Sequence, residues 1–273
     1  MTLDLAGCTH VGLKRSENQD EVFAQVLSKG SRTVACLAVA DGMGGHLKGR
    51  EASQAAITTV REKLIVWLRD EQAIPDENWC KLLEEEAHLS VRSISSSREI
   101  AGTTLTVGLI VGEEFIIGHV GDSRAYYFRD GILKQITEDQ TWEEFARKNN
   151  VENKHGNALL QAIGVDDRVA PDTYRIELEE GDWLLMCSDG LYKMVDEANL
   201  RSAIAVSVSA SDACNRLLAL ALDAGGRDNV GICVARLTDP GFESRKINLP
   251  LLIACGALAV VLFLMILALS GKI

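Results

Sequence analysis

The stretch Val34-Ala35-Cys36-Leu37-Ala38-Val39-Ala40-Asp41-Gly42-Met43-Gly44-Gly45 runs from an unbroken apolar segment directly into an aspartate and a glycine-rich turn. An apolar run of this length, bounded by glycine, is typical of a buried β-strand. The same arrangement recurs, with a strand-like run beside an aspartate: residues 115–120 with Asp122, 183–187 with Asp189, and 230–234 with Asp228. This pattern predicts that four carboxylates gather at one end of a sheet.

Carboxylates that gather in this way repel one another and resist burial unless a cation neutralises them. All-oxygen ligands suit hard divalent ions such as Mg²⁺ or Mn²⁺. Because glycine lets a backbone carbonyl approach a cation closely, Asp41 and the Gly42 carbonyl can face one site, and the carboxylate could bridge two metals. The turn matches neither the G-x-G-x-x-G nor the G-x-x-x-x-G-K-[ST] nucleotide pattern. The sequence therefore predicts a metal-dependent enzyme.

The composition suits a folded, acidic domain. The chain has 273 residues, 47% of them hydrophobic, and a formal net charge of −11. This negative charge argues against nucleic acid as the main partner, because phosphate binding needs clustered Lys and Arg. The cysteines form no C-x-x-C pair, so we expect free thiols in a reducing compartment.

Strand-like segments occur in groups, and helical segments occur in pairs between them. Strands are expected at residues 4–13, 21–27, 32–40, 103–111, 114–120, 125–129, 174–178, 183–187 and 230–237. Apolar spacing predicts helices at residues 48–69, 77–96, 197–205 and 211–224. This grouping indicates an α+β fold of antiparallel sheets whose faces are covered by helical hairpins. We expect one domain over residues 1–238 and a linker at residues 239–248.

A long apolar segment follows the expected linker. Residues 247–271 contain no charge, and residues 249–269 are almost wholly apolar. Since about 20 helical residues span the roughly 30 Å hydrocarbon core of a bilayer, residues 249–270 are predicted to form a single transmembrane helix. Arg245 and Lys246 precede this segment, and their weak positive-inside signal predicts a tail-anchored membrane protein with its large domain in the cytoplasm.

Short motifs along the chain resemble one enzyme family in composition and in order. They are Arg15-Ser16-Glu17-Asn18-Gln19-Asp20, Ala40-Asp41-Gly42-Met43-Gly44-Gly45-His46, Ala101-Gly102-Thr103-Thr104, Gly118-His119-Val120-Gly121-Asp122-Ser123-Arg124, Leu160-Gln161-Ala162-Ile163-Gly164, Gly181-Asp182-Trp183-Leu184-Leu185-Met186-Cys187-Ser188-Asp189-Gly190-Leu191 and Gly226-Arg227-Asp228-Asn229. Over residues 5–237 the chain thus resembles the metal-dependent serine/threonine protein phosphatases of the protein phosphatase 2C (PPM) type, in their bacterial form.

The resemblance implies a four-layer α-β-β-α sandwich with two Mn²⁺ or Mg²⁺ ions at one edge. Asp41 would bridge both ions. Asp189 and Asp228 would hold the first ion, and the Gly42 carbonyl would hold the second.

Two further aspartates take supporting roles in this family pattern. Asp20 would support the centre through water. Asp122 resembles the aspartate that binds a third, weaker ion together with Asp189.

The reaction implied is hydrolysis of phosphoserine or phosphothreonine in proteins. A water that bridges two cations supplies hydroxide at neutral pH and attacks phosphorus directly, without a phosphoenzyme. Arg15 is a candidate substrate clamp, because a guanidinium can grip a phosphate through two parallel hydrogen bonds. Met43 stands where animal relatives place a histidine acid, so the proton for the leaving group is expected from His46 or from metal-bound water.

Besides Met43, two further departures from the family pattern lie near these motifs. Gln19 stands where relatives commonly carry glutamate, and the lost charge could weaken the second metal site. Gln140 stands where histidine is usual, at the base of a substrate-side flap expected over residues 142–157. His119 lies in a predicted strand and is expected to be a core residue rather than a ligand.

Two other interpretations stay open. One is a catalytically weak, phosphatase-like scaffold or sensor that binds phosphoproteins, and the other is a metallohydrolase acting on small phosphate esters. The protein phosphatase is favoured because Gln19 is the only change near the predicted metals. Its expected partners are phosphorylated proteins, among them a cognate Ser/Thr kinase and its substrates.

Overall fold

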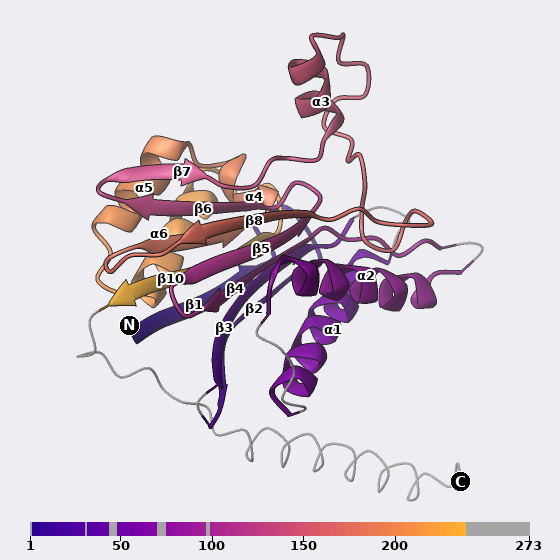
Figure 1. Ribbon diagram of the computed structural model, residues 1–273. Helices are drawn as coiled ribbons and strands as arrows, with labels where there is room; N and C mark the ends of the chain where they lie inside the picture. The colour runs from indigo at the N-terminus through magenta and orange to yellow at the C-terminus, as the bar shows by residue number, and fades with distance from the viewer. Residues whose placement is uncertain (1, 31, 44–47, 70–74, 97–98, 239–273) are drawn as a thin grey trace, which may run out of the picture. The chain divides into compact units, whose positions relative to one another are not determined.

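Two five-stranded sheets organise the part of the chain that the computed structural model describes, which is residues 2–30, 32–43, 48–69, 75–96 and 99–238 (Figure 1). The strands are β1 (Thr2–His10), β2 (Asp20–Lys29), β3 (Arg32–Asp41), β4 (Leu105–Val111), β5 (Glu114–Val120), β6 (Arg124–Arg129), β7 (Ile132–Gln135), β8 (Asp172–Glu177), β9 (Trp183–Cys187) and β10 (Val230–Thr238). The helices are α1 (Gly49–Arg69), α2 (Glu77–Ile94), α3 (Trp142–Asn149), α4 (Asp189–Tyr192), α5 (Glu197–Ala205) and α6 (Ala210–Asp223).

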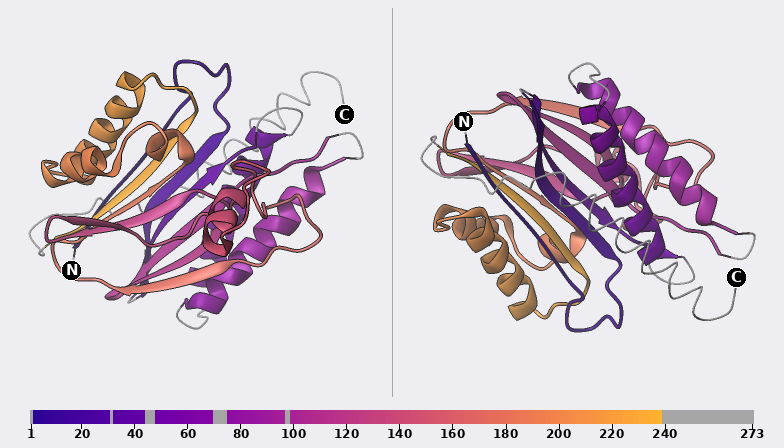
Figure 2. Two further views of the ribbon diagram at one scale, coloured as in Figure 1. Left: turned by 90° about the horizontal axis from the view of Figure 1, so that it is seen from above. Right: turned by 90° about the horizontal axis from the view of Figure 1, so that it is seen from below.

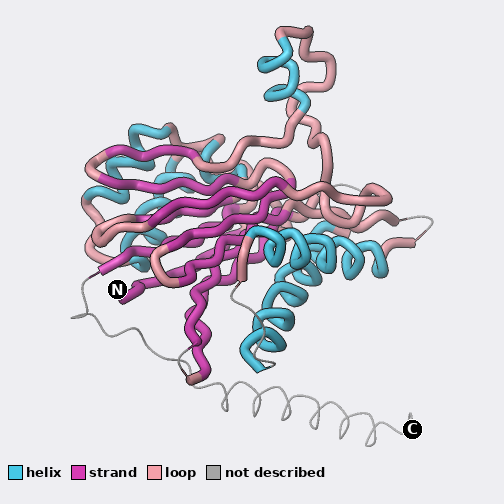
Figure 3. The backbone as a smooth tube through the Cα atoms, viewed as in Figure 1, coloured by secondary structure: helices cyan, strands magenta, loops and turns pink. Residues whose placement is uncertain are grey.

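Neighbouring strands are antiparallel in both sheets. One sheet has the order β1-β10-β9-β6-β7 and the other has the order β2-β3-β4-β5-β8. Figure 2 shows α1 and α2 on one side of the strands and α5 and α6 on the opposite side, and Figure 3 separates the helices from the strands by colour. The predicted α+β sandwich of antiparallel sheets covered by helical pairs is confirmed.

Strand β3 illustrates why the layers form. Cys36 and Ala38 belong to the apolar cluster shared with α1 and α2, whereas Leu37 and Val39 belong to the cluster shared with the other sheet. Successive side chains of a strand point to opposite faces, so a strand buried on both faces must be apolar throughout. This explains the unbroken apolar run that precedes Asp41.

Three short elements were not predicted: β7, α3 and α4. Each has eight residues or fewer, too short for a clear apolar period. In addition, β4 begins at Leu105 rather than at Thr103, because Thr103 forms isolated bridges to Gly42 and Ile163. These differences matter because α4 and the segment before β4 both contribute to the site.

The membrane prediction concerns residues outside this description. Among the described residues, no helix combines the length and the apolar character needed to cross a bilayer. The chain divides into one unit of residues 1–243 and another of residues 244–273. The expected linker at 239–248 and the expected transmembrane segment at 249–270 lie outside the described residues, so the tail anchor stays a prediction.

Candidate active site

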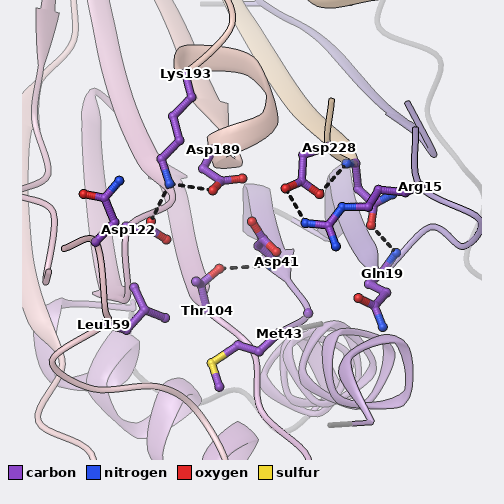
Figure 4. Close-up of a pocket in the computed structure, with 13 residues that line it drawn as sticks. Arg15, Gln19, Asp41, Met43, Thr104, Asp122, Leu159, Asp189, Lys193 and Asp228 are labelled. Atoms are coloured by element: carbon purple, nitrogen blue, oxygen red, sulfur yellow. Dashed lines mark hydrogen bonds and ion pairs between the residues drawn. The ribbon is translucent and has the colours of Figure 1, made fainter. Parts of the chain in front are cut away.

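The ends of several strands carry the predicted carboxylates into one pocket. Asp41 is the last residue of β3, Asp122 lies between β5 and β6, Asp189 follows β9, and Asp228 precedes β10. All four line a cavity of about 210 Å³ together with Arg15 (Figure 4). Its other lining residues are Gln19, Gly42, Met43, Thr104, Asn157, Leu159, Lys193 and Asn229.

Two threonines before β4 hold Asp41 in place. The backbone N–H of Asp41 donates to Thr104 Oγ1 at 2.9 Å, and its carbonyl accepts from Thr103 Oγ1 at 2.9 Å. The next N–H, of Gly42, donates to the Gln19 carbonyl at 3.0 Å. A side chain at position 42 would lie 2.2 Å from the Gly49 carbonyl oxygen, so only glycine fits this turn. The backbone at the end of β3 is therefore rigidly placed.

Close contact between α4 and the start of β10 brings Asp189 near Asp228. A Cβ atom at Gly190 would lie 1.8 Å from the Asn229 carbonyl oxygen, which makes glycine necessary there. The Asn229 amide also ties the N-terminal loop to this point. It donates to the Val11 and Glu17 carbonyls at 2.9 and 2.8 Å and accepts from the Gln19 N–H at 2.9 Å.

Asp20 does not line the pocket. It pairs with Asp41 across β2 and β3, and it is only 3% exposed. Ser188 Oγ donates to Asp20 Oδ2 at 2.6 Å and accepts from the Gly231 N–H at 2.9 Å. Asp20 thus lies beside Asp41 on the neighbouring strand, close to the strands that carry the other carboxylates.

Burial makes the ionised form of these carboxyl groups unfavourable. Desolvation raises the pKa of Asp41 well above its usual value, and the charge of Asp20 adds to this effect. Desolvation also raises the pKa of Asp20 to about 7 and that of Asp122 to about 6. A bound cation would oppose these pKa shifts, because an adjacent positive charge favours the ionised carboxylates.

Two basic side chains already approach the cluster. Arg15 Nη2 lies 2.7 Å from Asp228 Oδ2, and the hydrogen bond to Asp228 raises the pKa of Arg15. Lys193 Nζ lies 2.7 Å from Asp189 Oδ2 and 3.6 Å from Asp122 Oδ2. The predicted phosphate clamp, Arg15, is therefore paired with a predicted metal ligand in this arrangement.

The donor set fits hard divalent cations. Within the described ranges, no three His, Cys, Asp or Glu side chains converge on one point as they stand. The pocket nonetheless offers only oxygen donors from its acidic residues, and the raised pKa values of Asp41 and Asp122 mark carboxylates in need of a counter-charge. Mn²⁺ or Mg²⁺ would suit these oxygen donors.

Both polar atoms of the Gln140 side chain form hydrogen bonds at the base of the predicted flap. Its Oε1 accepts from the Gly121 N–H at 2.8 Å and from Gln161 Nε2 at 2.9 Å. Its Nε2 donates to Asp172 Oδ2 at 2.8 Å and to the His119 carbonyl at 3.2 Å. Glutamine in place of histidine therefore joins the flap to the sheet through both ends of its amide.

The predictions for His119 and His46 have different outcomes. His119 is completely buried, with Nδ1 2.9 Å from Thr106 Oγ1 and Nε2 3.0 Å from the Glu138 carbonyl, which confirms the predicted core residue. His46, the candidate acid, lies outside the described residues.

Lys193 is the charged pocket residue that sequence reasoning missed. A signal was available, because a lysine four residues after an aspartate is a common helical ion pair. No helix was predicted between residues 187 and 197, so this spacing had no structural meaning until α4 was known.

A family model for protein phosphatase 2C matches residues 8–223. The chain belongs to the protein phosphatase 2C family, which confirms both the resemblance and the prediction of a protein phosphatase. Protein phosphatase PhpP of Streptococcus pneumoniae is 29% identical over 252 residues, which cover 88% of this chain and 100% of that protein. Serine/threonine protein phosphatase PstP of Mycobacterium tuberculosis is 34% identical over 251 residues, covering 88% of this chain and 46% of that protein.

Solved structures show the same fold. The Mycobacterium tuberculosis serine/threonine phosphatase PstP/Ppp has a TM-score of 0.76 at 31% identity, covering 88% of this chain and 100% of that one. The catalytic domain of PstP in complex with two manganese ions has a TM-score of 0.74 at 32% identity, covering 87% of this chain and 100% of that one.

Proposed function

We propose that this chain hydrolyses phosphoserine and phosphothreonine in proteins in a metal-dependent reaction. The observation that carries this proposal is the gathering of Asp41, Asp122, Asp189 and Asp228 with Arg15 around one pocket. The manganese complex of the related PstP domain supports the choice of metal.

Two divalent ions fit the following roles. Asp41 would bridge them, Asp189 and Asp228 would hold the first, and the Gly42 carbonyl would hold the second. Such ions, when bound, lower the pKa of a water molecule and neutralise phosphoryl charge. The chain itself supplies the rigid placement of Asp41 through Thr104.

Arg15 is the residue proposed to orient the substrate. Its guanidinium carries five N–H donors, so the pair with Asp228 leaves donors for phosphoryl oxygens. Little covalent chemistry falls to the protein in phosphoryl transfer, and positioning together with charge stabilisation dominates. The pair with Asp228 also holds the guanidinium at the pocket before substrate arrives.

The pocket has room for a single phosphorylated side chain. Pockets that enclose a whole ligand usually measure about 300–1,000 Å³. A cavity of about 210 Å³ with polar lining suits a phosphorylated side chain whose remaining contacts lie outside the cavity. Asn157 and Leu159, which follow the flap helix α3, line this cavity and would contact such a substrate.

The membrane location is part of the proposal. The uncharged residues 249–270 would hold the domain at the inner face of a membrane, where its substrates would be membrane-associated phosphoproteins, including a Ser/Thr kinase. His46 remains a predicted acid for the leaving group.

A phosphothreonine peptide assay tests the activity. The full chain is incubated with Mn²⁺, Mg²⁺ or EDTA, alongside Asp189→Asn and a control, Asp223→Asn, at an exposed aspartate of α6. Phosphate release that needs metal and is lost only in Asp189→Asn is expected. Peptide binding without turnover under every metal would favour the scaffold, and hydrolysis confined to small esters would favour the metallohydrolase.

A further inference from the structure

We propose that the Lys193 ammonium is a resident cation of this centre, which takes the place between Asp122 and Asp189 that a third metal ion would need. The inference rests on the proposed function, because it concerns the same metal centre. It limits the centre to two ions, with Lys193 supplying the remaining positive charge.

The position of the ammonium carries this inference. Lys193 Nζ lies 2.7 Å from Asp189 Oδ2 and 3.6 Å from Asp122 Oδ2, so one charged group faces both carboxylates (Figure 4). The Asp122 and Asp189 side chains are 9% and 21% exposed, against 39% for Lys193. The lysine therefore reaches from solvent inward and covers the two carboxylates that the resemblance assigns to a third ion.

The single turn of α4 determines where the ammonium lies. Lys193 follows the helix directly, four residues after Asp189, so both side chains project from the same side of the turn. The neighbouring Tyr192 hydroxyl donates to Asp122 Oδ2 at 3.3 Å. Two consecutive residues of the chain thus contact the same carboxylate.

A second layer of contacts fixes Tyr192. The Arg124 guanidinium carbon lies 3.7 Å from the centre of the Tyr192 ring, a cation–π arrangement. Arg124 is itself held by Asp139, with its Nε 2.9 Å from Oδ1 and its Nη2 2.7 Å from Oδ2. The turn that presents Lys193 is therefore supported from β6, independently of any metal.

Arg15 does not play the same part. It comes from the loop between β1 and β2 and, among the described residues, forms an ion pair with Asp228 alone, whereas Lys193 faces two carboxylates. The guanidinium can turn to a phosphate and keep part of its pairing, because it has several donors. The Lys193 ammonium is a compact point charge and therefore resembles a metal ion more closely than a guanidinium does.

The consequence is a competition between Lys193 and a divalent ion. A third ion bound by Asp122 and Asp189 would lie beside an ammonium of the same sign, and the two would repel each other. Loss of the ammonium should therefore open a metal site that the wild type does not use.

The test is the number of Mn²⁺ ions bound by the full chain, measured by titration calorimetry and by the electron paramagnetic resonance signal of free Mn²⁺. Wild type is expected to bind two ions and Lys193→Met three. Lys193→Arg, which keeps a cation, should bind two. The matched control is Lys63→Met, since Lys63 pairs with Glu86 at 2.8 Å away from the centre.

Asp122→Asn keeps the inference testable if Lys193→Met does not fold. Asp122 holds neither of the two expected ions, so this variant should still bind two. Three ions in wild type, two in a folded Lys193→Met, or one in Asp122→Asn would each overturn the role of Lys193 and leave the phosphatase proposal standing. A wild type that binds no Mn²⁺ would refute the metal centre, and this inference with it.

Discussion

Replacement of Asp122 by asparagine should stabilise the metal-free protein at high pH. Asp122 is 7% exposed, and desolvation raises its pKa from 3.8 to about 6, with the charge of Asp189 adding to the effect. Lys193 and Tyr192 act in the opposite direction without cancelling this shift. The folded protein therefore binds this proton more tightly than the unfolded protein does.

The sign and size follow from linkage. Because the pKa is higher in the folded state, the carboxyl costs no stability below about pH 3.8, and the cost is complete above about pH 6. One pKa unit corresponds to about 1.4 kcal/mol, so the full cost is about 3 kcal/mol. Asparagine does not titrate, so the difference in unfolding free energy between the variant and wild type should widen by about 3 kcal/mol as pH rises through this range. Roughly half of that widening should occur between about pH 5 and pH 8.

Urea unfolding at pH 5 and pH 8, with EDTA present, measures this gap. Asp223→Asn, at an exposed aspartate of α6, controls for the general loss of one negative charge. A gap for Asp122→Asn that stays constant between the two pH values, or that narrows toward pH 8, would refute the burial of a charge that Lys193 and Tyr192 compensate only in part.

Other consequences are equally open to measurement. Asp41→Asn should lower Mn²⁺-dependent peptide hydrolysis by at least about 100-fold, since several kcal/mol of metal stabilisation are lost, while far-UV circular dichroism stays unchanged; full activity would contradict the bridging role. Gly190→Ala should lower the free energy of unfolding in urea by about 1–3 kcal/mol, because the new methyl group would clash with the Asn229 carbonyl; an unchanged midpoint would exclude this close contact. Mn²⁺ binding should weaken as pH falls below about 7 and release protons, since the positive charge of the metal favours the ionised form of the nearby Asp20; calorimetry in two buffers of different ionisation enthalpy would detect that release, and its absence would argue against coupling between Asp20 and the metal centre. A chain truncated after Lys246 should leave the membrane fraction and keep its activity; continued sedimentation with membranes would rule out a tail anchor.

Much of the fold could be predicted because local pattern reflects burial. The run ahead of Asp41 is apolar at every position because β3 is buried on both faces, and its bounds were accordingly predicted within one residue. Helix α4 gave no such pattern. Its single turn depends on the contact of Gly190 with Asn229, which comes from a distant part of the chain. Gln140 illustrates the same limit, since its hydrogen bonds to Gly121 and Asp172 at the flap base depend on contacts that the residue order does not specify.

The sequence by itself determined the kinds of donor and their placement at strand ends, because an aspartate beside glycine or asparagine next to an apolar run is a local feature. Only the tertiary structure decided how the charges pair. Arg15 meets Asp228 across 213 positions of the chain, and Ser188 meets Asp20 across 168. Pairing and desolvation depend on distances of a few ångströms in the folded chain, and the order of residues does not specify those distances. That is why the sequence predicted the carboxylates of the site, whereas the part played by Lys193 emerged only from the fold.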